Sequence, residues 1–269
     1  MKLKVKTKEL LNACKIAGFA SAKRTTAPSL NALLIESNDG TLTVTGSNIA
    51  TFIKVKCPCE MEKPGAIGVP AAIFQHHLSN IQSDTVELDM DNRTLVVKAD
   101  GVARFGVLEK KDFNNFPNFS PVLSVVAPEC DIRNGFAKVK PAIGEDVARP
   151  FIETALVEVK DLKFQFTATL GNAVLHTYFP QDGDGLTASA LVPAELVAMI
   201  VQSLDEKSPR ELKFSFSDKA ILLETDSVTI HGQLMEGKFP PWEQVIPAPV
   251  DRPIKVPRQA MIQIGRAHV

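Results

Sequence analysis

The sequence predicts an α+β protein made of a repeated unit in which helices accompany an antiparallel sheet. Short runs that alternate apolar and polar residues, such as Leu3-Lys-Val-Lys6, indicate strands, and stretches with apolar residues at helical spacing indicate helices. The order of these elements begins again after about residue 123, so the chain carries two copies of one domain. A length of 269 residues agrees with two domains of ordinary size.

The first copy is expected to open with a strand and a helix. The alternation over residues 3–6 predicts the strand, and apolar residues at helical spacing predict a helix that is capped by Thr7 and ended by Gly18. Further alternating runs, with turn residues at Asn38-Asp-Gly40, predict antiparallel strands at residues 33–37, 42–45 and 52–56.

A second helix is expected to begin at Pro70, because proline is favoured in the first turn of a helix. The buried face of this helix is expected to hold Ile73, Phe74, His77 and Leu78. Three more runs after it predict strands at residues 86–90, 94–98 and 104–108.

Landmarks of the first copy return about 123 residues later. They are Val69-Pro-Ala71, which returns as Val192-Pro-Ala194, Phe116-Pro-Asn-Phe119, which returns as Phe239-Pro-Pro-Trp242, and Gly46-Ser-Asn48, which returns as Gly171-Asn172. A shared offset over landmarks this far apart indicates that a whole domain is repeated.

The second copy is expected to hold a helix after Pro193 and then strands at residues 212–216, 221–225 and 228–234. The apolar stripe of that helix consists of Leu196, Val197, Ile200 and Leu204. A third copy is expected to begin near Ile254, which gives domains at residues 1–123 and 124–250 and the start of a third at 251–263. Residues 264–269 lack an apolar period and are expected to be a non-native tail, which makes the natural product longer by roughly one domain.

The composition is that of a soluble globular protein. Hydrophobic residues make up 45% of the chain and charged residues 23%, which excludes a disordered chain. The 30 basic and 31 acidic residues nearly cancel, so DNA binding requires basic residues that are sorted onto one surface. The chain has no apolar run that could span a bilayer, no signal peptide and only four cysteines, so we expect a cytoplasmic protein.

Several segments resemble the bacterial-type processivity clamp, the beta subunit of DNA polymerase III. In the first copy they are Arg24 with Pro28, Leu30, Leu33 and Leu34, then Asp39–Gly46, Gly68–Ala71, Arg104-Phe105 and Asp112–Asn118. In the second copy they are Ala168–Gly171, Val192-Pro193, Glu236–Pro240 and Val245–Pro247. The order and spacing of these segments, together with the repeat, carry the resemblance from residue 1 to about residue 263.

The resemblance implies the DNA-clamp fold, in which six similar domains from two subunits form a ring with helices around a central hole. It implies a non-enzymatic sliding clamp that encircles double-stranded DNA without sequence preference and needs no cofactor. Its partners are then a replicative polymerase, a clamp loader and other proteins with clamp-binding peptides. A clamp truncated inside its third domain is expected to be monomeric or weakly associating, although the full-length protein is expected to be a homodimer.

Basic residues on the inner helices are the DNA contacts that the resemblance implies. Such residues touch phosphates and therefore read no sequence. Only Arg24 matches a DNA contact of the family directly, and an ordinary solvated face is the alternative for the first helix. The expected set is Lys8, Lys15, Lys23, Arg24, Lys138, Lys140 and Arg149.

The resemblance also implies an apolar pocket for short peptides, with ordinary packing of strand ends as the alternative. The glycine in this set would let a peptide approach the backbone. Residues Leu170–Val174 replace the family's Asp-Gly-His-Arg-Leu, and Gln244 replaces a common arginine, so the polar rim is changed. The matching residues are Ile152, Thr169, Gly171, Asn172, Val174, Pro240, Gln244 and Val245.

Other sites and function classes are weighed against this interpretation. Cys57-Pro-Cys59 with His76-His77 lacks the spacing of a zinc site, and Gln181–Gly185 lacks the later ligands of a calcium loop, so no metal is expected. The sequence contains no catalytic motif. The competing classes are a repeat-built module that binds carbohydrate or protein and an enzyme whose residues converge only in the fold. One tryptophan and one tyrosine are too few for the aromatic platforms of a sugar-binding module.

Overall fold

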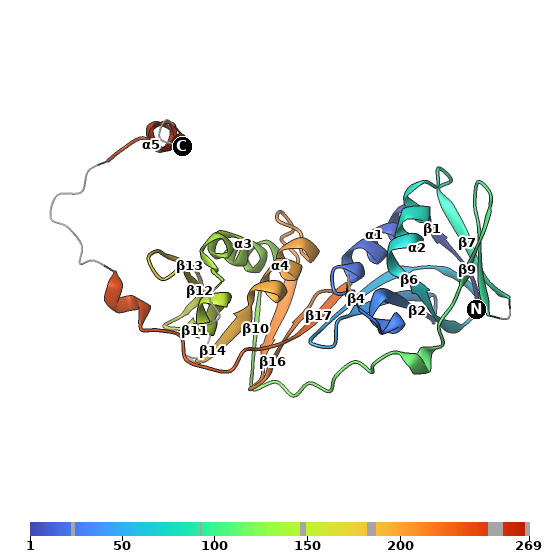
Figure 1. The fold of residues 1–269 in the computed structure, drawn as a ribbon, viewed down its shortest axis with the longest axis horizontal. Helices are drawn as coiled ribbons and strands as arrows, with labels where there is room; N and C mark the ends of the chain where they lie inside the picture. The colour runs from blue at the N-terminus through green and yellow to red at the C-terminus, as the bar shows by residue number, and fades with distance from the viewer. Residues whose placement is uncertain (23–24, 92, 146–148, 182–186, 247–254, 267–269) are drawn as a thin grey trace. The chain divides into compact units, whose positions relative to one another are not determined.

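The computed structural model describes residues 1–22, 25–91, 93–145, 149–181, 187–246 and 255–266 (Figure 1). The chain divides into two compact units, Met1–Lys238 and Phe239–Val269. The first unit holds both copies of the repeat. No helix in the described ranges is long and apolar enough to cross a membrane.

The first copy alternates strands with two helices. Its elements are β1 (Lys2–Lys6), α1 (Thr7–Gly18), the 3-10 turn η1 (Pro28–Asn31), β2 (Ala32–Asn38), β3 (Thr41–Ser47), β4 (Thr51–Pro58), β5 (Glu60–Lys63), β6 (Gly65–Pro70), α2 (Ala71–Ser79), β7 (Thr85–Asp91), β8 (Thr94–Lys98) and β9 (Val102–Gly106). A second 3-10 turn, η2 (Lys110–Asp112), follows. The predicted strands and helices are confirmed, although the last strand begins and ends two residues earlier than expected.

The second copy repeats this order. Its elements are β10 (Leu123–Pro128), α3 (Glu129–Val139), η3 (Lys140–Ala142), η4 (Pro150–Glu153), β11 (Thr154–Lys160), β12 (Lys163–Thr169), β13 (Val174–Pro180), β14 (Ala188–Pro193), α4 (Ala194–Ser203), β15 (Glu211–Phe216), β16 (Ala220–Glu224) and β17 (Val228–Gln233). The predicted α+β class is therefore correct.

In the described residues, three antiparallel sheets form the first unit. The largest has the order β10-β15-β16-β17-β4-β3-β2-β6, so each copy supplies half of its eight strands. The copies are joined where β17 pairs with β4, with Ile230 opposite Ile53. The remaining sheets have the orders β5-β1-β7-β8-β9 and β13-β12-β11-β14. Helix α1 packs against both α2 and α4, and α4 packs against α3, so the helices form a row that crosses from one copy to the other (Figure 1).

The structure corrects one landmark of the repeat. Sequence similarity matched Asn48 with Asn172, but the turns after β3 and β12 match Ile49 with Gly171. Both residues have positive φ, at 80° and 91°. The Asn48 amide donates to the Thr51 carbonyl at 3.2 Å, and the Leu170 amide donates to the Ala173 carbonyl at 3.0 Å. The shared turn geometry, rather than the shared asparagine, sets the true correspondence.

The start of α1 also differs from expectation. Thr7 is the first residue of the helix and not its cap, and Lys6 occupies the N-cap position without a side-chain hydrogen bond. The Thr7 hydroxyl instead donates to the Ser83 carbonyl at 2.7 Å and is buried. The helix ends at Gly18 as predicted. A side chain at Gly18 would overlap the Gln75 amide, which donates to the Cys14 carbonyl at 2.7 Å and ties α2 to α1.

Helix α2 has a narrower buried face than the sequence suggested. Phe74 and Leu78 are buried, but Ile73 is 64% exposed, so its predicted place in the core is wrong. His77 is half-buried beside the Phe105 ring, with centroids 5.4 Å apart. Pro70 occupies the N-cap position rather than the first turn. In a helix of nine residues, one stripe at i and i+4 covers the sheet and the adjacent positions face solvent.

The core of the second copy is aromatic. Phe136 on α3 lies edge-on to Phe166, with ring centroids 4.9 Å apart, and both are fully buried. Gly135 makes this contact possible, because a side chain at this position would overlap the Phe166 ring. Phe164 and Phe214 continue the cluster at a centroid distance of 5.2 Å.

The second unit contains η5 (Trp242–Val245) and α5 (Arg258–Arg266). Trp242 is buried. The expected strand of a third copy falls partly on residues 251–254, which lie outside the described residues, and residues 255–257 have no regular structure. Helix α5 extends into the predicted tail as far as Arg266, and residues 267–269 lie outside the described part.

Candidate functional site

The row of helices presents exposed lysines. Lys8 and Lys15 lie on α1, Lys138 lies on α3, and Lys140 follows it directly. All four side chains are exposed. Within the described ranges, none of these four amino groups forms an ion pair with a carboxylate. They are therefore available to an external anion.

Three carboxylates on the same helices accept hydrogen bonds from protein donors. Glu129 is 2% exposed, and it accepts from the Arg210 guanidinium at 3.1 Å and from the Asp205 amide at 3.0 Å. The Glu9 carboxylate accepts from the Lys6 amino group at 3.0 Å, and the Glu195 carboxylate accepts from the side-chain amide of Asn48 at 3.1 Å. Glu129 is thus paired with Arg210 and Glu9 with Lys6, whereas the four lysines have no ion-pair partner among the described residues.

Three residues of the expected DNA-facing set stand apart. Lys23 and Arg24 lie outside the described residues. Arg149 is exposed, and its guanidinium lies 3.3 Å from the position that a side chain on Gly171 would occupy. The structure thus places Arg149 beside Gly171, a residue of the expected peptide pocket.

A rigid turn between β12 and β13 holds part of the expected peptide pocket. The Thr169 hydroxyl donates to the Ala173 carbonyl at 3.0 Å and accepts from the Gly171 amide at 3.0 Å. Gly171 has a φ of 91°, which glycine adopts without steric cost. Asn172 is exposed and Val174 is half-buried at the start of β13.

Ile152 lies under this turn. It belongs to η4 and is 2% exposed, and its carbonyl accepts from the Gly144 amide at 3.1 Å. A side chain at Gly144 would meet Ile152 at 2.6 Å and Leu170 at 3.3 Å, so both residues pack against that glycine. The structure therefore brings Ile152 together with the Thr169–Val174 turn.

The other three residues of the expected pocket belong to the second unit. Pro240 precedes η5, while Gln244 and Val245 lie within it. The Gln244 amide donates to the Pro241 carbonyl at 3.2 Å. The Val245 side chain is 65% exposed, whereas Trp242 in the same turn is buried.

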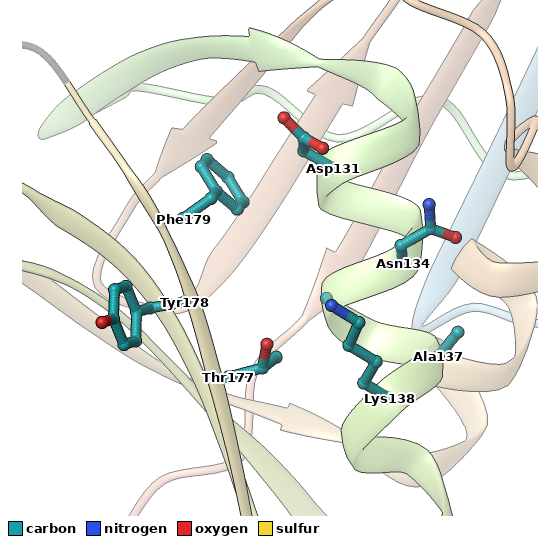
Figure 2. A pocket seen from close by; sticks show the side chains of 8 residues that line it. Asp131, Asn134, Ala137, Lys138, Thr177, Tyr178 and Phe179 are labelled. Atoms are coloured by element: carbon teal, nitrogen blue, oxygen red, sulfur yellow. The ribbon is translucent and has the colours of Figure 1, made fainter. Parts of the chain in front are cut away.

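A hollow between α3 and β13 was not predicted. Figure 2 shows Asp131, Asn134 and Lys138 along α3, with Thr177, Tyr178 and Phe179 along β13, on its two sides. Its volume is about 320 Å³. The only sequence signal was the single tyrosine, Tyr178, within an alternating run, and the side chain is 52% exposed with the Lys163 amino group 4.6 Å from its ring centroid.

The cysteines considered for zinc are shielded thiols. Burial raises the pKa of Cys57 to about 12 and also raises the pKa of Cys59, so both thiols are protonated at neutral pH. The described residues include no group of three or more side chains arranged to hold a metal ion. Residues 182–185 of the weighed calcium loop lie outside the described part of the chain.

Comparison with known proteins gives consistent results. Residues 1–120 match the profile of the family described as DNA polymerase III beta subunit, N-terminal domain. The beta sliding clamp of Salmonella typhimurium is 22% identical over 256 residues, which cover 94% of this chain and 69% of that protein. The beta sliding clamp of Bacillus subtilis is 22% identical over 263 residues, which cover 92% of this chain and 68% of that protein.

Solved structures share the fold. The DNA polymerase III subunit beta from Pseudomonas aeruginosa superposes with a TM-score of 0.87 at 21% identity, over 93% of this chain and 69% of that one. The DNA polymerase sliding clamp from Bacillus subtilis superposes with a TM-score of 0.86 at 19% identity, over 92% of this chain and 68% of that one.

Proposed function

We propose that this chain is a member of the family of DNA polymerase III beta subunits and a non-enzymatic DNA sliding clamp subunit. In this proposal, clamp domains at residues 1–123 and 124–250 and the start of a third at 251–263 form part of a ring around duplex DNA. The ring tethers a replicative polymerase and other clamp-binding proteins. The relatives that match most of the chain are sliding clamps, which favours this function over a carbohydrate- or protein-binding module.

The observation that carries the proposal is the row of helices that continues from one copy to the next. Helices α2, α1, α4 and α3 contact one another in that order, and the copies share one eight-stranded sheet. A surface that repeats with the domain is suited to a ligand that is itself repetitive and uniform, as the phosphate backbone of duplex DNA is.

The charges on this row support loose contact with DNA. Lys8, Lys15, Lys138 and Lys140 supply ammonium groups without an ion-pair partner among the described residues, and Glu9 and Glu129 on the same helices are paired with Lys6 and Arg210. Each phosphate contact adds affinity that falls steeply with salt and carries no sequence information. A few such contacts position a duplex without holding it in one register, which sliding requires.

In this proposal, clamp-binding peptides contact the turn between β12 and β13. Ile152 and Val174 offer apolar side chains, and Gly171 leaves the backbone open to a peptide. Asn172 and Arg149 supply exposed polar groups at its rim.

Binding of short labelled duplexes of two unrelated sequences tests the DNA part of the proposal. We expect equal affinity for both sequences and a steep loss of affinity with salt. The double variant Lys8→Glu with Lys15→Glu should weaken binding to both duplexes equally. Lys219→Glu, a change at an exposed lysine in the turn between β15 and β16, is the matched control and should leave binding unchanged. Preference for one sequence, or unchanged binding by the double variant, would overturn the assignment.

A further inference from the structure

A groove lies between the two copies, beside the strand pair that joins them. Its volume is about 560 Å³, within the range of about 300–1,000 Å³ that is usual for small-molecule sites. The first copy supplies one wall from α1 and β4. The second copy supplies the other wall, which includes residues 202–205 at and after the end of α4 and Ser227 before β17. The walls meet where the Lys56 amide donates to the Ser227 carbonyl at 2.8 Å, so the groove depends on the joint between the copies.

Basic side chains line this groove from both walls. Lys15 on α1 and Lys56 on β4 are exposed, and neither amino group forms an ion pair in the part of the chain that the structure describes. Arg210 lies on the opposite wall and is half-exposed. Its guanidinium donates from Nη2 to Glu129 at 3.1 Å and from Nε to the Ser208 hydroxyl at 2.9 Å. These two hydrogen bonds hold the guanidinium in place and leave Nη1 for a ligand.

Two of the carboxylates that line the groove are paired within the protein. Glu129 is paired with Arg210, and Glu9 is paired with Lys6. A third, Asp205, is exposed and has no ion-pair partner among the described residues. The two unpaired ammonium groups of the groove therefore face one unpaired carboxylate. This balance favours an anionic ligand over a cationic one.

Two residues that line the groove have a buried oxygen atom without a hydrogen-bond partner in the described structure. One atom is Oε2 of Glu9, on the first wall, and the other is the hydroxyl oxygen of Ser203, on the second. Ser203 is only 6% exposed. Most buried polar atoms in folded proteins are paired, so these two indicate partners that the chain itself does not supply. A ligand hydroxyl would donate to Glu9, and an anionic oxygen would accept from Ser203.

Apolar side chains complete the lining. Val55 and Leu204 are buried, whereas Ile16 on α1 and Phe19 directly after α1 are only half-buried. The Phe19 ring has no aromatic partner among the described residues. An aromatic side chain that is open to a groove is a platform on which a planar base stacks.

We propose that the groove binds a free nucleotide that bridges the two copies. Its phosphate contacts Lys15, Lys56 and Arg210, because ammonium and guanidinium groups are the usual partners of phosphate oxygens. A sugar hydroxyl donates to Glu9, as ribose hydroxyls do to carboxylates in other nucleotide sites, and the base packs on Phe19. Nucleotides inside a DNA strand have no free sugar hydroxyl, so Glu9 favours the free nucleotide over the duplex. The site lies beyond the proposed DNA contact, although it shares Lys15 with it.

Equilibrium dialysis with radiolabelled adenosine 5′-monophosphate tests the proposal. The wild-type chain should bind the nucleotide, and unlabelled adenosine should compete at least about tenfold less well than unlabelled adenosine 5′-monophosphate because it lacks the phosphate. Lys56→Glu should weaken binding at least about tenfold. Lys219→Glu, at an exposed lysine outside the groove, should bind as the wild type does. Absence of binding by the wild type, or equal binding by Lys56→Glu, overturns the proposal.

A second comparison tests the sugar contact at Glu9. Glu9→Ala should weaken binding of adenosine 5′-monophosphate about tenfold, because it removes the acceptor of the sugar hydroxyl. The same variant should bind 2′,3′-dideoxyadenosine 5′-monophosphate as the wild type does, because that nucleotide has no hydroxyl to donate. An equal loss for both nucleotides would show that Glu9 acts only through the structure of the groove, and would overturn its contact with the sugar.

Duplex binding distinguishes this site from the proposed DNA contact. Lys8 belongs to the expected DNA-facing set and does not line the groove, so Lys8→Glu should weaken duplex binding and leave nucleotide binding unchanged. Lys56→Glu should do the reverse. If Lys8→Glu loses as much nucleotide affinity as Lys56→Glu, the nucleotide is held only by the general charge of the surface, and the groove site is wrong. If the chain binds no duplex, the proposed function fails while the nucleotide result still stands.

Discussion

His231 and Phe52 face each other across the strand pair that joins the two copies, with ring centroids 6.1 Å apart. Phe116 and Phe119, from the segment that links the copies, lie 5.7 Å and 6.0 Å from the same imidazole. His231 is 3% exposed, and its Nδ1 has no hydrogen-bond partner in the described structure. The joint therefore encloses an ionisable group whose neutral form is favoured by burial.

Acid should weaken this joint. Burial lowers the pKa of His231 below its usual value of 6.5, so the unfolded chain takes up a proton more readily than the folded chain. The contribution of the neutral imidazole to stability is complete above pH 6.5 and is lost as the pH falls through the folded-state pKa. Urea unfolding of His231→Phe should show a smaller loss of stability between neutral and mildly acidic pH than the wild type. His76→Gln, at an exposed histidine, should keep the wild-type pH dependence.

The backbone of Ile49 is strained, so substitution by glycine should stabilise the protein. Its φ is 80°, in a region where a branched side chain collides with the backbone, and the side chain is 57% exposed and loses little packing when removed. Ile49→Gly should raise the free energy of unfolding by about 0.5–1 kcal/mol after the entropy of glycine is subtracted. The equivalent turn supplies the reverse change, since Gly171→Ala should lower it by about 1 kcal/mol. Equal urea midpoints for Ile49→Gly and the wild type would show that the turn is unstrained.

Glu129 should be important for the stability of the second copy. Its buried carboxylate accepts from Arg210 and from the Asp205 amide, so Glu129→Ala leaves a guanidinium and an amide without their acceptor. We expect a loss of about 2–3 kcal/mol, below the full effect of breaking a buried pair because Arg210 is half-exposed. Glu129→Gln keeps an acceptor of similar shape and should lose less. Glu211→Ala, at an exposed glutamate, serves as the control in the same urea titration.

A substitution at Thr169 should weaken peptide binding beyond what its effect on stability explains. Thr169→Val removes both hydrogen bonds that shape the turn at Gly171, and we expect it to weaken binding of a labelled clamp-binding peptide in fluorescence anisotropy. The Thr225 hydroxyl also donates one hydrogen bond and accepts one, both with the Val228 backbone in the turn between β16 and β17. Thr225→Val should therefore lose a similar stability, about 1–2 kcal/mol, without affecting the peptide. Equal peptide affinity of the two variants would place the peptide site elsewhere.

Local sequence patterns predicted helices and strands better than they predicted the distant contacts of individual side chains. The strands that alternation predicted are present, and the end of α1 at Gly18 is confirmed, because these depend on neighbours in the chain. Strands β10 to β14 of the second copy were not predicted. The cap predicted at Thr7 was wrong because its hydroxyl bonds to Ser83, which is 76 residues away. Ile73 was misplaced because the sheet beneath α2 covers only one narrow stripe.

Part of the candidate site was likewise expected from the sequence, and part of it was not. The residues near the turn at Gly171 were found through a resemblance, and the structure brings Ile152 and Thr169–Val174 together. The hollow beside Tyr178 and the groove between the copies were not predicted. Both depend on which helices and strands come together in the fold, and the alternating pattern of a single strand does not show its neighbours.

The β17–β4 joint consists of a strand pair and a groove beside the end of a helix, and none of its strands comes from the segment that links the copies. Covalent continuity is therefore not what defines the boundary between neighbouring domains. Fusion or fission of genes can redistribute such domains among polypeptides while the geometry from one domain to the next is conserved. The same number of domains can then be reached with a few long chains or with more short ones.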